Sequence, residues 1–171
     1  MAAITLHIAT PDDADAVTEL FKRSYATLLV DDYAPDVLEL GMAFLARANP
    51  DLLASGTYYL AKTEAGDVVG AGGWTAVRPG SDDADVQSGL AHVRHFAVDP
   101  AYARMGIASM LFDRCVEDAK ASESVTRFEC YSTLSARRFY ESRGFRVIGD
   151  FAVPFAPNFS FPSLHMVCDL N

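Results

Sequence analysis

The chain has 171 residues and half of them are hydrophobic, so it can bury one core and is too apolar to be disordered. Its net charge of −9 at pH 7 argues against nucleic acid or an anionic membrane as the main partner. No stretch comes near about 18 uncharged apolar residues, and the first residues show no basic-then-apolar signal. We therefore expect one globular domain, residues 1–171, that is soluble and cytoplasmic.

Three cysteines, Cys115, Cys130 and Cys168, lie far apart in apolar segments. Their number is odd, and no pair has the spacing of a metal site or a redox motif. We expect buried free thiols in a reducing compartment and no bound metal.

The N-terminal part predicts a strand followed by two helices. Residues 4–9 alternate between apolar and polar side chains, as a strand does. Residues 10–13, Thr-Pro-Asp-Asp, are typical of a helix start, with a threonine cap, an early proline and acidic residues near the positive end of the helix dipole. A second helix follows Pro35 and ends near Asn49-Pro50, which leaves residues 31–33 as the joint between the helices.

The next part predicts a hairpin and a polar loop. Strands over residues 57–62 and 68–77 flank a short turn. The glycines between Gly70 and Gly73 indicate a bulge or a close approach of backbones, because they open no helix as a nucleotide-binding loop would. Residues 79–89 are predicted to form an acidic surface loop.

A strand, a turn and a helix follow one another over residues 91–121. The strand ends at Asp99-Pro100, because proline has no N–H to donate to a sheet. From Ile107 on, apolar residues repeat with helical spacing, and Gly106 lies in the turn where the helix begins. Such a turn presents unpaired backbone N–H groups at the positive end of a helix, which predicts a binding site for an anion.

The C-terminal part predicts a strand over residues 125–131, a short helix, and two further strands over 145–153 and 164–170. Residues 132–133 supply the helix cap, and Gly144 ends the helix in the left-handed conformation. The segment between the last two strands holds three prolines among phenylalanines and is expected to be an ordered apolar loop. The order of elements predicts an α/β domain with a mixed sheet.

Two motifs lie in register with this order: residues 103–108, Ala-Arg-Met-Gly-Ile-Ala, and residues 136–145, Ala-Arg-Arg-Phe-Tyr-Glu-Ser-Arg-Gly-Phe. Together they resemble the GCN5-related N-acetyltransferase (GNAT) superfamily, whose motifs read Q/R-x-x-G-x-G/A and A-x-x-F-Y-x-x-x-G-F. The resemblance implies the GNAT fold, an α/β architecture with a mixed central sheet of about seven strands, splayed at the middle and flanked by about four helices. Two positions depart from the pattern: Ala103 stands at the leading Gln/Arg position, with Arg104 one place later, and Thr133 stands where the family often has asparagine.

The resemblance implies acetyl-CoA as the cofactor. Its pyrophosphate would lie on backbone N–H groups of residues 104–109, and its pantetheine arm in the gap between the strands at 96–98 and 128–131. The implied cofactor-binding residues are Phe96, Ala97, Val98, Arg104, Met105, Gly106, Ile107, Ala108, Ser109, Thr133, Ala136, Phe139 and Tyr140.

Acetyl transfer to an amine requires a base for the amine, a donor for the developing oxyanion and a proton for the leaving thiolate. By resemblance, the backbone N–H of Val98 is the oxyanion donor and Tyr140 is the catalytic acid. A phenol, with an ordinary pKa of about 10, suits that role.

The base is the least determined of the three groups. Counted back along the strand, His92 falls where histone acetyltransferases carry glutamate and serotonin N-acetyltransferase carries histidine, and its ordinary pKa of about 6.5 suits a base. His95 and Glu129 are the alternatives. Strict alternation predicts that His92, Arg94 and Phe96 share one face of the strand while His95 lies on the other.

The acceptor pocket is expected between the helix joint, the loop at 79–89 and the loop at 151–161. The predicted substrate-binding residues are Tyr25, Tyr33, Glu129 and Phe155, with Asp31, Asp32 and Phe159 beside them. Acidic and aromatic side chains together favour an amine with an apolar body.

We therefore predict an N-acetyltransferase that moves an acetyl group from acetyl-CoA to a primary amine of a small molecule or peptide by direct transfer in a ternary complex. No cysteine or serine shows a partnered base, so no acyl-enzyme is expected. The alternatives are a non-catalytic acyl-CoA-binding or sensing module, and a related enzyme that uses another acyl-CoA. A monomer and a homodimer both remain open, because the C-terminal strands offer an edge for pairing.

Overall fold

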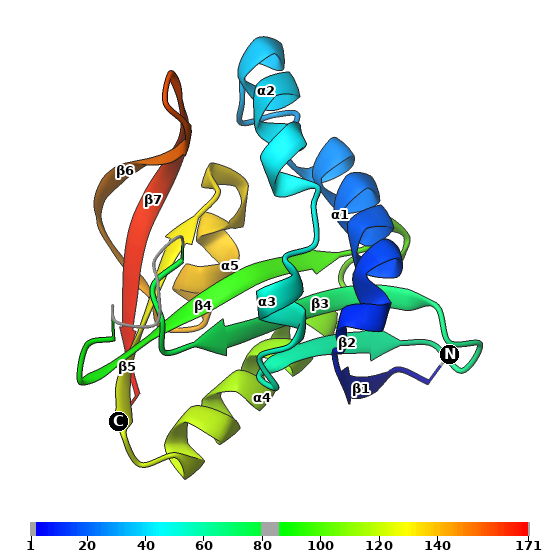
Figure 1. The fold of residues 1–171 in the computed structure, drawn as a ribbon, viewed down its shortest axis with the longest axis vertical. Coiled ribbons are helices and arrows are strands. Elements are labelled where there is room, and N and C mark those ends of the chain that lie inside the picture. Colours follow the sequence, from blue (N-terminus) through cyan, green and yellow to red (C-terminus); the bar gives the residue numbers. More distant parts are fainter. Residues whose placement is uncertain (1–2, 80–85, 171) are drawn as a thin grey trace.

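The chain forms one sheet of seven strands with helices packed on both faces (Figure 1). Residues 3–79 and 86–170 are described in a computed structural model. The strands are β1 (Thr5–Ile8), β2 (Tyr58–Lys62), β3 (Val68–Thr75), β4 (Gly89–Val98), β5 (Val125–Ser132), β6 (Arg146–Ala156) and β7 (Phe159–Asp169). The helices are α1 (Ala14–Leu28), α2 (Pro35–Leu45), α3 (Pro50–Leu53), α4 (Ile107–Ala121) and α5 (Arg137–Ser142), with 3-10 turns at Pro11–Asp13, Pro100–Tyr102 and Leu134–Ala136.

The strand order is β1-β2-β3-β4-β5-β7-β6, which makes the sheet mixed as predicted. Among the described residues, β4 and β5 form the one parallel pair, and every other neighbouring pair is antiparallel. A parallel pair needs a crossover connection, and α4 supplies it. The helix start before α1 is also confirmed, since the backbone N–H of Thr10 donates to Asp13 Oδ2 at 2.9 Å.

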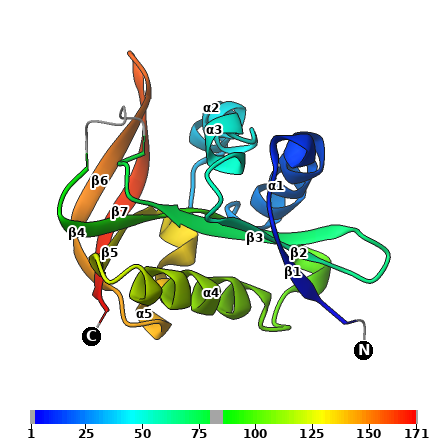
Figure 2. The same ribbon diagram turned by 60° about the horizontal axis from the view of Figure 1, so that its bottom comes forward.

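Helices α1, α2 and α3 cover one face of the sheet, and α4 and α5 cover the other (Figure 2). Phe21 and Leu53 belong to the core on the first face, and Leu111 and Phe112 to the core on the second. The short helix α3 was not predicted; Asn49 starts it, because its Oδ1 accepts from the N–H groups at 51 and 52. None of the described helices is long and apolar enough to cross a membrane.

The predicted apolar loop near the C-terminus is wrong, because β6 and β7 form one long hairpin. Their pairing continues through Pro154 opposite Ser160 and Ala152 opposite Pro162. Proline is tolerated at bulges and edges. Pro154 adjoins a register shift, and Pro162 lies beyond the residues that pair with β5.

The predicted second hairpin strand is shorter than expected, since β3 ends at Thr75 and Val77 forms only an isolated bridge with Val86. The expected close approach of backbones is confirmed, because a Cβ at Gly73 would lie 2.3 Å from the carbonyl oxygen of Thr57. Residues 80–85, which hold the acidic residues of the predicted polar loop, lie outside the described part of the chain.

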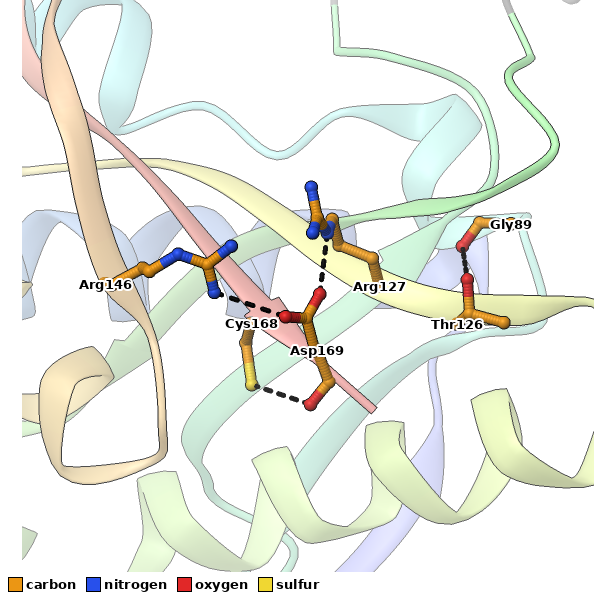
Figure 3. A network of polar contacts seen from close by, with 6 residues as sticks. All are labelled: Gly89, Thr126, Arg127, Arg146, Cys168 and Asp169. Carbon is orange, nitrogen blue, oxygen red and sulfur yellow. Dashed lines mark hydrogen bonds and ion pairs between the residues drawn. The ribbon is translucent and has the colours of Figure 1, made fainter. Parts of the chain in front are cut away.

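The sheet is closed at one end of the β4–β5 pair and open at the other. Figure 3 shows the closed end, where Thr126 donates to the Gly89 carbonyl at 3.3 Å. Beside it, Asp169 accepts from Arg127 of β5 at 2.7 Å and from Arg146 of β6 at 3.3 Å, which ties three strands together. These two arginines lower the pKa of the Asp169 carboxyl.

The predicted splay is present at the other end. The parallel pairing stops after His92 opposite Glu129. In the part of the chain that the structure describes, β4 pairs from there with β3 alone and β5 with β7 alone, so their facing edges separate. The opening begins within the predicted 128–131 segment, after Glu129.

Candidate active site at the strand opening

Two cavities adjoin the opening between β4 and β5. The first has a volume of about 340 Å³, and we name it the turn cavity because it lies at the turn before α4. It is lined by Leu28, Phe96, Ala97, Val98, Tyr102, Ala103, Arg104, Gly106, Ile107, Ala108, Ser109, Ser135, Ala136, Phe139 and Tyr140. The predicted cofactor-binding residues all line it except Met105, which is 44% exposed, and Thr133, which lines the second cavity.

The second cavity has a volume of about 230 Å³, and we name it the hairpin cavity because β6 and β7 form one of its walls. It is lined by Tyr25, Phe44, Leu45, Pro79, Val93, Arg94, His95, Phe96, Cys130, Tyr131, Ser132, Thr133, Ala136, Tyr140, Val153, Phe155, Phe161 and Ser163. Its described lining includes no aspartate or glutamate, so the expected acidic character is not found there.

The turn before α4 has the backbone geometry of an anion site. Arg104 and Gly106 both adopt left-handed conformations, with φ of 63° and 77°, and among the described residues no side chain caps α4. Asp99 fixes the turn, because it accepts from the Ala101 N–H and from Arg23 Nε of α1, each at 2.9 Å. The first N–H groups of this 15-residue helix therefore face the cavity with the positive end of its dipole.

A buried hydroxyl in the turn cavity also fits a polar ligand. The Oγ of Ser135 is buried and has no hydrogen-bond partner among the described residues, although it lines this cavity. A buried polar group without a partner is costly, so a ligand that hydrogen-bonds here would remove the cost. Sequence reasoning missed Ser135, because it lies directly before the second motif, whose pattern does not include that position.

The backbone of β4 points an N–H group into the opening. The Asp99 N–H donates to the Val69 carbonyl of β3 at 2.9 Å. Because successive N–H groups of a strand point to opposite sides, the Val98 N–H points away from β3 and toward the unpaired edge of β5. Val98 also lines the turn cavity.

A bulge in β4 changes the predicted faces. His95 and Phe96 together lie opposite the single residue Gly72, and His95 has a φ of 49°. As a result His95 stacks on Phe21 of α1, with ring centroids 4.0 Å apart, whereas Phe96 packs against Phe112 of α4. The predicted alternation is therefore wrong beyond Arg94, because it assumed an unbroken strand.

The carbonyl groups of the bulge are occupied by two tyrosines. Tyr58 donates to the His95 carbonyl at 2.6 Å, and Tyr25 donates to the Phe96 carbonyl at 3.3 Å. These bonds fix the bulge from the α1 side of the sheet. Burial raises the pKa of both phenols, so both remain donors at neutral pH.

Tyr140 lies in the wall that the two cavities share. Phe96, Ala136 and Tyr140 line both cavities. The Tyr140 side chain is buried, and burial raises its pKa well above 10, so the phenol carries its proton at pH 7.

The candidate bases lie in different surroundings. His92 is 2% exposed and lines neither cavity; its Nδ1 lies 3.3 Å from Glu129 Oε1, and Glu129 Oε2 lies 2.8 Å from Nε2 of His165. His95 lines the hairpin cavity, and its Nε2 must carry a proton because it bonds the Leu45 carbonyl at 2.9 Å. Burial lowers the pKa of His95 to about 4, so its ring is neutral at pH 7.

Only some of the predicted acceptor-binding residues line the hairpin cavity. Tyr25 and Phe155 line the hairpin cavity, whereas Tyr33 and Glu129 do not. The Tyr33 hydroxyl donates to the Pro162 carbonyl at 2.7 Å and accepts from the Leu134 N–H at 2.9 Å, which ties the helix joint to the hairpin.

Asp31, Asp32 and Phe159 also lie outside the lining of the hairpin cavity. Sequence reasoning did not predict Arg94 as a site residue. Arg94 lies on the same face of β4 as His92, and this face is the one that points away from α4.

Residues 32–153 match the family model described as an acetyltransferase (GNAT) domain, and a search of curated proteins gave no match. The fold is similar to a GCN5-related N-acetyltransferase from Rhodopseudomonas palustris, with a TM-score of 0.74 and 20% identity, covering 99% of this chain and 96% of that one. It is similar to the PaiA N-acetyltransferase from Thermoplasma acidophilum in complex with coenzyme A, with a TM-score of 0.71 and 12% identity, covering 98% and 99%. It is also similar to N-acetylglutamate synthase from Neisseria gonorrhoeae complexed with coenzyme A and N-acetyl-glutamate, with a TM-score of 0.62 and 14% identity, covering 100% of this chain and 36% of that one.

The family model spans most of the chain, and the motifs that it covers line the turn cavity. The mixed seven-stranded sheet with its opening agrees with the fold that the motifs imply. The chain therefore belongs to the GNAT acetyltransferase family, whose enzymes depend on an acyl-CoA, usually acetyl-CoA.

Proposed function

We propose that this chain transfers the acetyl group of acetyl-CoA directly to a primary amine while both substrates are bound. The observation that carries the proposal is the wall common to the two cavities, made by Phe96, Ala136 and Tyr140. A thioester that enters through the turn cavity and an amine that enters through the hairpin cavity would meet at this wall. Direct transfer then needs no acyl group on the protein itself.

The turn cavity would hold the cofactor. Backbone N–H groups at the start of α4, together with the left-handed turn at Arg104 and Gly106, suit a pyrophosphate. Each exposed charge interaction at a helix end contributes about 0.3–1 kcal/mol, so several amides and the Arg104 side chain must act together. When bound, acetyl-CoA supplies the acetyl group as an activated thioester.

Tyr140 is proposed as the catalytic acid and the Val98 N–H as the oxyanion donor. An acid at this position must keep its proton until the sulfur leaves, and the raised pKa of Tyr140 ensures that it does. The Val98 N–H points from β4 into the opening, where a carbonyl oxygen that gains charge would accept it.

His92 is proposed as the base that takes the proton of the amine. His92 belongs to the last β4–β5 pair before the opening, and it lines neither cavity. The proton would therefore have to reach His92 through an intervening group, and the Glu129 carboxylate lies beside it, with Oε1 at 3.3 Å from Nδ1. His95 and Glu129 remain the alternatives, and single variants distinguish the three.

Titration with acetyl-CoA tests the proposal. At a ligand concentration of about 100 times Kd, binding stabilises the folded chain by about 2.7 kcal/mol, which a thermal melt detects. Free-thiol detection over a panel of amines then reports coenzyme A release. The absence of both signals removes the proposal, whereas binding without thiol release over the whole panel supports the non-catalytic module.

A further inference from the structure

The hairpin cavity contains a cation at a place where the sequence predicted acidic groups. Arg94 extends from β4 into its lining and is half-buried. No described residue of that lining is an aspartate or glutamate, and the ion pairs among the described residues do not involve Arg94. Within residues 3–79 and 86–170, therefore, no carboxylate compensates the charge of this guanidinium inside the cavity.

A single hydroxyl orients this guanidinium. Nη1 of Arg94 donates to Thr75 Oγ1 at 2.9 Å, and Thr75 in turn donates its own proton to the Val77 carbonyl at 2.8 Å. A guanidinium has five N–H donors, and in residues 3–79 and 86–170 the hydroxyl of Thr75 is its one acceptor. The remaining donors are available to a ligand.

Burial makes this arrangement unfavourable unless an anion fills it. Desolvation lowers the pKa of Arg94, yet a guanidinium keeps its charge in proteins. A partly desolvated cation beside a neutral partner is stabilised most by a carboxylate. The two carboxylate oxygens can accept two parallel hydrogen bonds from the planar guanidinium.

Most of the remaining lining of the hairpin cavity is apolar or aromatic, and its polar members are His95 and the hydroxyl residues Ser132, Thr133 and Ser163. Phe155 of β6 stacks on Phe44 of α2 with ring centroids 5.1 Å apart and on Phe161 of β7 at 5.4 Å. At about 230 Å³ the cavity is smaller than the range of about 300–1,000 Å³ that is typical for drug-sized ligands. These properties favour a small acceptor with an apolar side chain.

We infer that the acceptor is a small amino acid with an apolar side chain, whose carboxylate is bound by Arg94 while its amine faces the wall at Phe96 and Tyr140. This inference rests on the proposed function. Arg94 acts here in substrate binding and takes no part in the proton transfers. Thr75 is a positioning residue, because it holds the guanidinium in place through one hydrogen bond.

Matched pairs of amines test the inference. Phenylalanine is compared with phenethylamine, and leucine with 3-methylbutylamine, because each pair differs only in the carboxylate. We expect the wild-type enzyme to favour the amino acid by about 10- to 100-fold in kcat/KM, which is the usual effect of one charged hydrogen-bonding group. In Arg94→Met the preference should disappear through a higher KM for the amino acids, and Thr75→Val should weaken it. Arg114→Met on α4, outside both cavities, is the matched control.

A binding experiment separates this inference from the proposed function. 3-Phenylpropionate has the carboxylate and the ring but no amine, so it binds without reacting. We expect it to raise the melting temperature of the wild type and of Arg114→Met, but not of Arg94→Met. If Arg94→Met does not fold, Thr75→Val takes its place in both experiments.

The outcomes of the two experiments distinguish a failure of the anion site from a failure of acetyl transfer. If no amine releases coenzyme A but 3-phenylpropionate still protects only chains with Arg94, acetyl transfer is wrong and the anion site stands. If amines without a carboxylate react as well as the amino acids in both wild type and Arg94→Met, the inference is overturned and acetyl transfer stands. Equal protection of both chains by 3-phenylpropionate, or none of either, also overturns it.

Discussion

Tyr140 meets Phe96 edge to face, with ring centroids 6.3 Å apart and an angle of 72° between the rings. Both residues line the turn cavity and the hairpin cavity, so this contact is the wall across which the two substrates would react. One ring comes from the bulge of β4 and the other from α5, and the bulge therefore determines where the wall stands.

The hydroxyl of Tyr140 should be needed for turnover and not for folding. We expect Tyr140→Phe to lower kcat by about 10²-fold or more, because positioned acids contribute about 10²–10⁴-fold. Heat protection by acetyl-CoA should be unchanged, since the ring remains. Tyr59→Phe, which removes a hydroxyl outside both cavities, is the control. An unchanged kcat in Tyr140→Phe would falsify the role of the acid.

Gly72 leaves the space in which the Phe96 ring lies. A Cβ at this position would be 2.8 Å from three atoms of that ring. We expect Gly72→Ala to displace Phe96, to lower the free energy of unfolding by about 1–3 kcal/mol, and to lower kcat/KM for both substrates. Gly149→Ala meets no atom within 4 Å and serves as control in urea unfolding and kinetics. Equal behaviour of the two variants would contradict this role of Gly72.

Arg104 has a strained backbone conformation and is proposed to bind the phosphates of the cofactor. A left-handed conformation costs a non-glycine residue about 1–2 kcal/mol. We expect Arg104→Gly to leave the melting temperature unchanged or raise it slightly, because glycine relieves the strain but loses more chain entropy on folding. Acetyl-CoA affinity, measured by calorimetry, should fall about two- to fivefold with the loss of one charge at the phosphates. A variant that binds acetyl-CoA as tightly as wild type shows that the side chain is not used.

His92 is tested by the pH dependence of the rate. As the base, it would give kcat/KM an acidic limb, because a protonated imidazole cannot accept the proton of the amine. We expect His92→Gln to lower kcat/KM by about 10²-fold and to remove this limb, while acetyl-CoA protection persists. His95→Asn and Glu129→Gln are measured alongside. If the limb stays in His92→Gln and vanishes in one of the others, that residue is the base.

His95 should make the fold less stable in acid. Burial lowers its pKa from 6.5 to about 4, so the folded chain binds this proton less readily than the unfolded chain does. The resulting stabilisation is full above pH 6.5 and is lost as the pH falls through about 4; at about 1.4 kcal/mol for each pKa unit it amounts to about 3 kcal/mol.

The variant His95→Asn removes this group and retains a residue that tolerates the left-handed backbone. We expect the difference in unfolding free energy between wild type and variant, measured in urea, to shrink between pH 7 and pH 4. A difference that does not vary with pH means that His95 does not titrate in this range.

The family and the residues of the proposed cofactor site follow from the sequence itself. The residues at 103–108 and 136–145 are local motifs, and the turn at Gly106 and the helix after it follow from proline, glycine and apolar spacing alone. All but two of the predicted cofactor residues therefore line the turn cavity.

Only the tertiary structure decided the acceptor side. The bulge at His95 depends on β3 lying opposite β4, and the β6–β7 hairpin depends on pairing that tolerates proline at a bulge and beyond the end of β5. Neither leaves a periodic signal in one segment, because each arises from contacts between residues far apart in the chain. For the same reason the sequence predicted acidic side chains at the acceptor pocket, whereas the described lining of the hairpin cavity holds Arg94 and no carboxylate.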